Sequence, residues 1–260
     1  MKNNNLNGEG IEFFLNGKIR YKGSFKNGSF DGYGNLYNKN ETLIYKGMFQ
    51  TGKYDGIGKS FYKNGKVKYE GTFKNDSRNG YGILHNSNGS LIYNGTFLEG
   101  KYNGNGTLYY GNGKIKYEGN FKNGLYDGYG LLYYYNGILK YKGIFLKGKF
   151  NGLGMSFYEN GKVKCEGNFK NDSINGYGIL YNSNGSLIYN GTFLEGKYNG
   201  NGTLYYWNGK IKYEGNFKDG LYDGYGLLYY YNGILKYKGI FLKDKFNGMG
   251  IYFYDNGNIQ

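Results

Sequence analysis

The chain has 260 residues, with 33 basic against 19 acidic side chains, and therefore a net charge of +14. A single cysteine excludes a disulfide framework and a cysteine-rich zinc site, and a single histidine excludes a multi-histidine metal site. No run of about 18 apolar residues occurs, so no membrane-spanning helix is expected.

A 24-residue repeat organises the whole sequence. Residues 21–260 fill ten units without a gap, and residues 1–20 align with the last twenty positions of one further unit. We number each unit from position 1, which is Tyr21 in the first complete unit, to position 24. Residues 69–164 and 165–260 differ at only 14 of 96 positions, which indicates a duplicated block of four units. The predicted organisation is one repeat array over residues 1–260.

Each unit is predicted to form a β-hairpin. Residues 114–122 alternate between apolar or small and polar side chains, which indicates a strand. The Asp-Gly or Asn-Gly pair at positions 11 and 12, such as Asp127-Gly128, is interpreted as the tight turn of the hairpin. A second strand is expected over residues 129–135, and Asn136-Gly137 then returns the chain to the next unit.

Glycine is invariant in the ten units at positions 3, 12 and 14, and phenylalanine at position 5. Positions 3 and 14 lie inside predicted strands, where glycine normally costs stability. We expect that the missing side chains let an aromatic ring of a neighbouring strand lie flat over the backbone, so that Gly119→Val prevents folding. The structural positions predicted in this way are Tyr117, Gly119, Phe121, Gly128, Gly130, Tyr213, Gly215, Phe217, Gly224 and Gly226.

The line Y-x-G-x-F-x-x-G-x-x-x-G-x-G-x-x-x-Y resembles the MORN (membrane occupation and recognition nexus) repeat. Residues 7–260 carry this resemblance, and a stretch around Cys165 is also similar to the variant repeat of bacterial YwqK-type antitoxins. The resemblance implies an all-β fold: an elongated, single-layer antiparallel sheet of stacked β-hairpins, with ten complete units and an N-terminal partial unit. In the third unit of the first block, the matching residues are Tyr117, Gly119, Phe121, Gly124, Gly128, Gly130 and Tyr134.

Catalysis is not expected, and no catalytic, metal-binding or cofactor-binding residue is assigned. His85 is replaced by Tyr181 in the duplicated block, and it is interpreted as an exposed strand or loop residue. Cys165 occupies a position that is otherwise tyrosine and is interpreted as a buried, inert thiol. Carboxylates such as Asp127 and Asp223 belong to the Asp-Gly pairs, where asparagine replaces them in six of ten units. No cofactor is expected, because no helix follows the Gly-x-Gly pairs.

Lysine recurs at positions 24 and 6, and glutamate at position 2 is expected on the same strand face. These lysines are candidates for contacts with anionic lipid headgroups, and the alternative is a solvated face that serves solubility. Nucleic acid is not an expected partner, since only Arg20 and Arg78 are arginines. The candidate lipid contacts are Lys68, Lys116, Lys122, Lys140, Lys212, Lys218 and Lys236.

The sequence therefore predicts a non-enzymatic scaffold for protein–protein interaction, with a second role at anionic membrane lipids. The protein partner is unidentified, and open strand edges favour self-association through the array ends, as the MORN resemblance also implies. The alternatives are a bacterial antitoxin-like module and a cell-envelope or glycan-binding module. Residues 1–10 contain no apolar signal core, so the expected location is the cytoplasm, including its membrane or cytoskeletal periphery.

Overall fold

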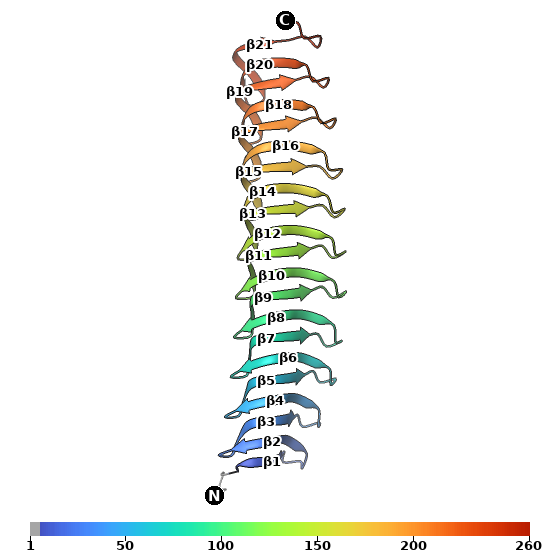
Figure 1. Cartoon of the computed structure of the whole chain (residues 1–260), viewed down its shortest axis with the longest axis vertical. Helices are drawn as coiled ribbons and strands as arrows, with labels where there is room; N and C mark the ends of the chain where they lie inside the picture. Colours follow the sequence, from blue (N-terminus) through green and yellow to red (C-terminus); the bar gives the residue numbers. More distant parts are fainter. Residues whose placement is uncertain (1–5) are drawn as a thin grey trace. The chain divides into compact units, whose positions relative to one another are not determined.

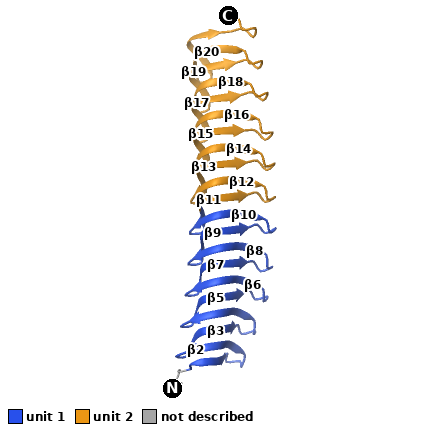
Figure 2. Cartoon of the chain, viewed as in Figure 1, with its two compact units in different colours: residues 1–126 blue, residues 127–260 orange. Residues whose placement is uncertain are grey.

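The computed structural model describes residues 6–260 of a chain that divides into two compact units, residues 1–126 and 127–260 (Figure 2). The regular secondary structure of the described residues is β-strand throughout, which confirms the predicted all-β class. Each unit contains a single layer of antiparallel strands joined as hairpins. The organisation of residues 1–260 as one array stays a prediction.

In the first unit, every strand pairs with the next one along the chain, from β1 to β10 (Figure 1). Its strands are β1 (Gly8–Phe13), β2 (Ile19–Lys26), β3 (Ser29–Tyr37), β4 (Leu43–Gln50), β5 (Lys53–Phe61), β6 (Val67–Lys74), β7 (Ser77–His85), β8 (Leu91–Leu98), β9 (Lys101–Tyr109) and β10 (Ile115–Lys122).

In the second unit, the same meander runs from β11 to β21, and β11 begins with the last two residues of the first unit. The strands are β11 (Leu125–Tyr133), β12 (Leu139–Leu146), β13 (Lys149–Phe157), β14 (Val163–Lys170), β15 (Ser173–Tyr181), β16 (Leu187–Leu194), β17 (Lys197–Tyr205), β18 (Ile211–Lys218), β19 (Leu221–Tyr229), β20 (Leu235–Leu242) and β21 (Lys245–Tyr252).

The tight turns of the hairpins lie at positions 7 and 8, so their prediction at positions 11 and 12 was wrong. Between β2 and β3, Asn27 and Gly28 both have positive φ, 49° and 75°, as a two-residue type I′ turn requires. Asp219 and Gly220 repeat this geometry between β18 and β19, with φ of 53° and 90°. Strand β11 therefore begins at Leu125, four residues before the predicted start at residue 129.

The Asp-Gly and Asn-Gly pairs instead form a β-bulge inside the second strand of each hairpin. One residue separates Gly23 from Phe25 on β2, whereas three separate their partners Phe30 and Gly34 on β3. Gly32 lies in this bulge with φ of 101°, which is why position 12 is always glycine.

The side chain at position 11 links one hairpin to the next. The Asp31 carboxylate accepts a hydrogen bond from the Thr51 N–H in the following turn, at 3.2 Å. The Asp127 carboxylate accepts in the same way from the Lys147 N–H, at 3.2 Å. These carboxylates therefore have a structural role, and asparagine serves the same purpose because its carbonyl oxygen is also an acceptor.

The second predicted turn, at Asn136-Gly137, is confirmed. The Gly137 N–H donates to the Tyr134 carbonyl at 2.9 Å, and the Tyr134 N–H donates to the Ile138 carbonyl at 2.8 Å. The Asn136 side-chain oxygen accepts from the Ile138 N–H at 2.9 Å, so this asparagine closes the loop that leads to β12.

Aromatic side chains on one face of the strands form the core, and we call this face the tyrosine face. Tyr93 is fully buried at position 1, and its ring stacks on that of Tyr102 with centroids 3.9 Å apart. It also contacts Phe97 and Phe121 edge to face, at 5.0 Å and 5.3 Å. The Tyr93 hydroxyl donates to the Thr96 carbonyl at 3.1 Å. Each aromatic pair adds about 0.5–1.5 kcal/mol beyond its buried area, so the rings join neighbouring hairpins of the first unit into one packed row.

Glycines at positions 3 and 14 pair across neighbouring strands and give the tyrosine rings their space. Gly95 lies opposite Gly106, and a Cβ on Gly106 would overlap the ring of Tyr93. At position 14 this confirms that a ring of the neighbouring strand fills the space over the glycine, whereas a Cβ at position 3, as on Gly95, would first meet the backbone of the facing strand. In the first unit the resulting row consists of Gly10, Gly23, Gly34, Gly47, Gly58, Gly71, Gly82, Gly95, Gly106 and Gly119.

Candidate binding groove

The residues singled out as structural positions belong to the features just described. Tyr117 and Tyr213 are fully buried on the tyrosine face, and Phe121 and Phe217 pack beside them. The six glycines have two different roles. Gly119, Gly130, Gly215 and Gly226 belong to the glycine rows, whereas Gly128 and Gly224 occupy position 12 of the bulge with φ of 99° and 96°.

On the opposite face of the strands, the glycine rows form the floor of a groove, and we call this the groove face. Adjacent residues of a strand point to opposite faces, so positions 2, 4, 13 and 15 project here. Asn94 and Thr107, at positions 2 and 15, pair on one side of the row, and Tyr81 and Thr96, at positions 13 and 4, pair on the other. The groove is thus walled by side chains and floored by backbone.

A tyrosine closes off a compartment of this groove in the first unit. Tyr81 is 58% exposed, and its hydroxyl donates to the Asn94 side-chain oxygen at 2.5 Å, so the side chain crosses the glycine row. The compartment beside it has a volume of about 420 Å³ and is also lined by Asn105, Thr107 and Glu118. This volume lies within the range of small-ligand pockets.

The second unit repeats this compartment with the same residue types. Tyr177 is 59% exposed, and its hydroxyl donates to the Asn190 side-chain oxygen at 2.5 Å. Asn201, Thr203 and Glu214 line the remaining walls of a volume of about 380 Å³. We call these two sites the Tyr81 and Tyr177 compartments.

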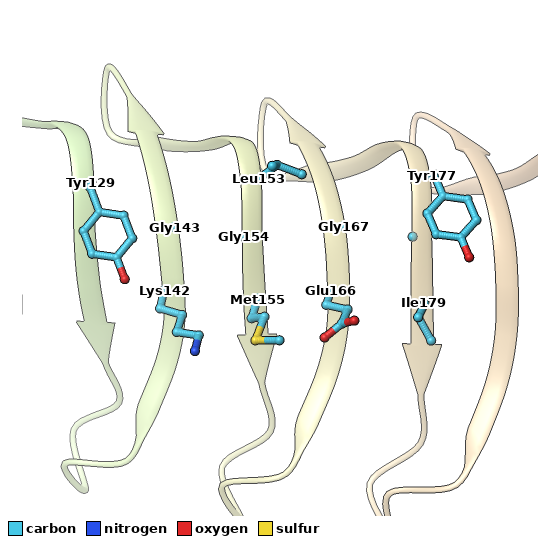
Figure 3. Close-up of a pocket in the computed structure, with 11 residues that line it drawn as sticks. Tyr129, Lys142, Gly143, Leu153, Gly154, Met155, Glu166, Gly167, Tyr177 and Ile179 are labelled. Atoms are coloured by element: carbon cyan, nitrogen blue, oxygen red, sulfur yellow. The ribbon is translucent and has the colours of Figure 1, made fainter.

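A third compartment in the second unit has a more apolar lining (Figure 3). Tyr129 and Tyr177 stand on either side of it, and Leu153, which is 74% exposed, lies between them. Its volume is about 390 Å³ over a floor of glycines. The other lining side chains are Lys142, Met155, Glu166 and Ile179.

Sequence reasoning missed the groove because it placed the turn at positions 11 and 12, so that position 13 was only the first residue of the predicted second strand. Position 13 carries the most exposed apolar side chains of the groove face, including Ile57, Leu153 and Met249 at 75%, 74% and 93%. The alternation of side chains along the strand could have indicated it. The glycine at position 14 turns its missing side chain towards the tyrosines, so the side chain at position 13 projects from the opposite face.

Five of the seven predicted lipid-contacting lysines lie over tyrosine rings on the tyrosine face. The ammonium groups at position 24 are 5.3–6.0 Å from the ring centroids at position 18, which is cation–π distance. The pairs are Lys68 with Tyr62, Lys116 with Tyr110, Lys140 with Tyr134, Lys212 with Tyr206 and Lys236 with Tyr230.

The expectation that these lysines share a face with the position-2 glutamates was wrong. The pairing of β17 with β18 shifts by one residue between Ile211 and Tyr213, and Lys212 is the extra residue. Lys212 therefore turns towards Tyr206 and Tyr222, while Glu214 lines the groove on the other face. A bulge breaks the alternation from which the shared face was inferred.

Lys212 and Lys236 also line a wider hollow on the tyrosine face of the second unit, of about 520 Å³. Tyrosines at positions 10 and 18 line part of this hollow, among them Tyr222, whose pKa is raised above its ordinary value by burial and by Asp244. The Asp244 carboxylate accepts from the Tyr222 N–H at 2.7 Å. The hollow therefore combines two ammonium groups and one carboxylate with tyrosine side chains.

Lys122 and Lys218 lie elsewhere, on the edge formed by positions 6 and 9, which flank each tight turn. We call these residues the hairpin edge. In six of the hairpins from β8–β9 onwards, one flanking residue is an exposed leucine and the other a lysine; Lys218 pairs with Leu221 in this way. The exposed leucines are Leu98, Leu125, Leu146, Leu194, Leu221 and Leu242, at 39–50% exposure.

The remaining polar candidates take no part in the groove. Burial raises the pKa of the Cys165 thiol to about 11, and its 5% exposure confirms the predicted buried thiol. His85 lies in β7 and is half-buried rather than exposed. Among residues 6–260, no three histidine, cysteine, aspartate or glutamate side chains are grouped so that they could hold a metal ion. The same residues form no helix of the length and hydrophobicity needed to cross a membrane.

Comparison with known families agrees with the repeat geometry. The MORN repeat profile matches residues 21–41, 69–91, 93–115, 117–138, 165–187, 213–234 and 237–259. The profile of the MORN repeat variant matches residues 6–27, 54–75, 150–171 and 198–219. No curated protein matches the chain. Because these profiles cover more than half of the sequence in the register of the observed hairpins, the chain belongs to the MORN repeat family.

Proposed function

We propose that the protein is a non-enzymatic scaffold that binds protein partners along its groove face. The observation that carries this proposal is the compartment that recurs in both units with a glycine floor and an exposed tyrosine, Tyr81 or Tyr177. MORN repeats are a non-catalytic repeat family, and they commonly serve as protein or membrane interaction scaffolds. Repeated, similar sites along a repeat protein suit a partner that is held at several points.

Filling the compartments tests this function. Thr107→Trp with Thr203→Trp places an indole in both compartments, at half-exposed strand positions on the face opposite the aromatic core. We expect a protein partner retained by the wild-type chain to be lost by this double variant. The matched control is Thr42→Trp with Ser90→Trp, in the loops outside the groove, which should retain it. Equal retention by both variants would contradict a groove-based scaffold.

A second candidate function is peripheral association with anionic lipid, for which the hairpin edge is the favouring observation. Exposed leucines alternate there with lysines, a combination that suits insertion of apolar side chains beside anionic headgroups. The first three hairpins carry Lys26, Gln50 and Lys74 at position 6 and no leucine at either position. The membrane periphery of the cytoplasm is the location that this second function would require.

Liposome co-sedimentation separates the hairpin edge from the lysines over the tyrosine rings. Leu194→Ser with Leu242→Ser should weaken binding to anionic vesicles several-fold, whereas Leu153→Ser, an exposed leucine of the groove, should leave it unchanged. Lys212→Gln with Lys236→Gln tests the alternative contact, the lysines over the tyrosine rings. If only these lysine changes weaken binding, the edge is not the lipid contact.

The antitoxin-like and glycan-binding alternatives and self-association through the array ends stay predictions. Self-association is measured most directly by light scattering over a tenfold range of protein concentration. A monomeric mass throughout that range would contradict it.

A further inference from the structure

We propose that the Tyr81 and Tyr177 compartments bind basic side chains, and arginine best, from a partner polypeptide. This inference rests on the proposed scaffold function of the groove and names the chemistry of its partner. It concerns two sites of identical composition, one in each unit.

Each compartment contains an uncompensated carboxylate. Glu118 and Glu214 are exposed and line the groove. The ion pairs between described residues join Lys18 to Glu41, Arg20 to Glu12 and Lys59 to Glu70, and they include neither of these glutamates. Neither compartment contains a lysine or an arginine. A cation brought by a partner would therefore meet a free carboxylate.

The lysines nearest in sequence to these glutamates are held on the other face. The Lys116 ammonium lies 5.8 Å from the Tyr110 ring centroid, and the Lys212 ammonium lies 6.0 Å from that of Tyr206. The one-residue register shift before Tyr117 and Tyr213 turns these lysines away from the groove. The chain thus keeps its own cations out of both compartments.

Neutral groups that favour a bound cation surround each carboxylate. An exposed tyrosine ring bounds the compartment, and the electron-rich face of an aromatic ring attracts a cation. The hydrogen bond from the tyrosine hydroxyl to the Asn94 or Asn190 oxygen holds the ring across the groove. The side chains of Asn105 and Thr107, or of Asn201 and Thr203, add further acceptors.

A basic side chain fits this chemistry better than a sugar. The exposed tyrosine ring can stack against a sugar as well as against a guanidinium, so the ring does not separate the two. A neutral sugar, however, would leave the carboxylate without a charged partner. Arginine is favoured over lysine because its planar guanidinium can donate two hydrogen bonds to one carboxylate and also stack on a ring. The net charge of +14 disfavours a basic peptide over the surface as a whole, so any binding reports a local site.

The test uses the full chain and a short fluorescein-labelled peptide of arginine, glycine and serine, with fluorescence polarisation as the readout. The control peptide carries citrulline, which is neutral and close to arginine in shape, in place of every arginine. We expect the arginine peptide to bind at least tenfold more tightly than the citrulline peptide. Equal affinities would overturn the proposal.

Variants of the protein test which side chains of the compartments bind the arginine peptide. Glu118→Gln with Glu214→Gln should weaken the arginine peptide about tenfold, and Tyr81→Leu with Tyr177→Leu should weaken it about fivefold. The matched control is Glu70→Gln, also at position 2 but paired with Lys59 at 2.8 Å, which should bind like the wild type. Thermal melts check that each variant folds. We expect all of them to fold, because these side chains lie outside the aromatic core. An affinity that is unchanged in the double glutamine variant would overturn the proposal.

The two proposals fail in different ways. If Thr107→Trp with Thr203→Trp abolishes retention of a protein partner while the double glutamine variant retains it, the scaffold stands and the basic-residue site is wrong. If the arginine peptide behaves as expected but partner retention does not depend on the groove, the cation sites stand and the groove scaffold is wrong.

Discussion

The 24-residue repeat at residues 69–92 and its duplicate at residues 165–188 share a strand register but differ in how the side chains on their tyrosine face pack. Tyr69 pairs with Leu84 in the first, and Cys165 pairs with Leu180 in the second. The glycine pairs Gly71–Gly82 and Gly167–Gly178 occupy the same places. The backbone is therefore unchanged by the loss of a tyrosine.

The packing differs because two positions have changed together. Tyr69 contacts Phe73 and Phe97 edge to face at 4.9 Å and 5.2 Å, and the Arg78 guanidinium lies 5.1 Å from the Phe97 ring centroid. In the duplicate, Cys165 has no ring, and Ile174 fills the space above Gly178. The comparison teaches that the glycine row and the strand ladder define the register, whereas the aromatic stack is a replaceable source of stability.

The largest expected effect concerns the glycine pair that both repeats share. A Cβ on Gly71 would lie 2.5 Å from the Gly82 Cα, and one on Gly167 would lie 2.7 Å from the Gly178 Cα. Since backbone cannot move aside, Gly71→Val and Gly167→Val should each cost more than about 3 kcal/mol and abolish the cooperative thermal transition in circular dichroism. Gly119→Val, at the same position, carries the same expectation. A melt like that of the wild type would show that the glycine row does not define the register.

A smaller effect on stability, from alanine at position 14, should distinguish the two repeats. A Cβ on Gly82 meets the Tyr69 ring, which is wedged between neighbours, whereas one on Gly178 meets mainly the flexible end of Ile174. We expect Gly82→Ala to cost about 3 kcal/mol and Gly178→Ala about 1.5 kcal/mol in urea unfolding. The reverse order would mean that the ring stack yields more easily than the isoleucine.

Restoring the aromatic pair sharpens the comparison further. Cys165→Tyr alone should destabilise the protein by about 2 kcal/mol, because Ile174 already fills the space above Gly178. Cys165→Tyr with Ile174→Tyr should recover this loss and exceed the wild type by about 1 kcal/mol through ring stacking. A double-mutant cycle measures the coupling. Additive effects would show that the two positions changed independently.

The smallest effect is a pH dependence at position 1, where the repeat at residues 69–92 has a tyrosine and its duplicate has Cys165. Burial raises the pKa of Tyr69 from 10.0 to about 12. Above pH 10 the unfolded chain therefore loses this proton first, so the stabilisation is complete below pH 10 and is lost as the pH rises towards 12. At about pH 11, the wild type should have lost about 1 kcal/mol more than Tyr69→Phe, each relative to its own stability at neutral pH. Parallel pH profiles of the two proteins would contradict the raised pKa.

The repeat pattern predicted several features correctly: two strands in each repeat, the loop at Asn136-Gly137, the glycines beneath the rings and the buried Cys165. These features depend on short-range rules. Side chains alternate along a strand. Glycine inside a strand costs stability, so its recurrence there indicates that a neighbouring ring requires the space. The positions of the core and the family resemblance could therefore be derived without coordinates.

Other features were decided only when strands paired. Asp31-Gly32 has the composition of a turn but forms a bulge, because Asn27-Gly28 already closes the hairpin four residues earlier. An inserted residue reverses the alternation of every side chain beyond it, so Lys212 and Glu214 lie on opposite faces although their spacing predicted one face. The groove likewise depends on contacts between neighbouring strands, since Tyr81 crosses the glycine row to reach Asn94. The repeat by itself determined which residues are buried, and the register between strands determined which of the others face one another.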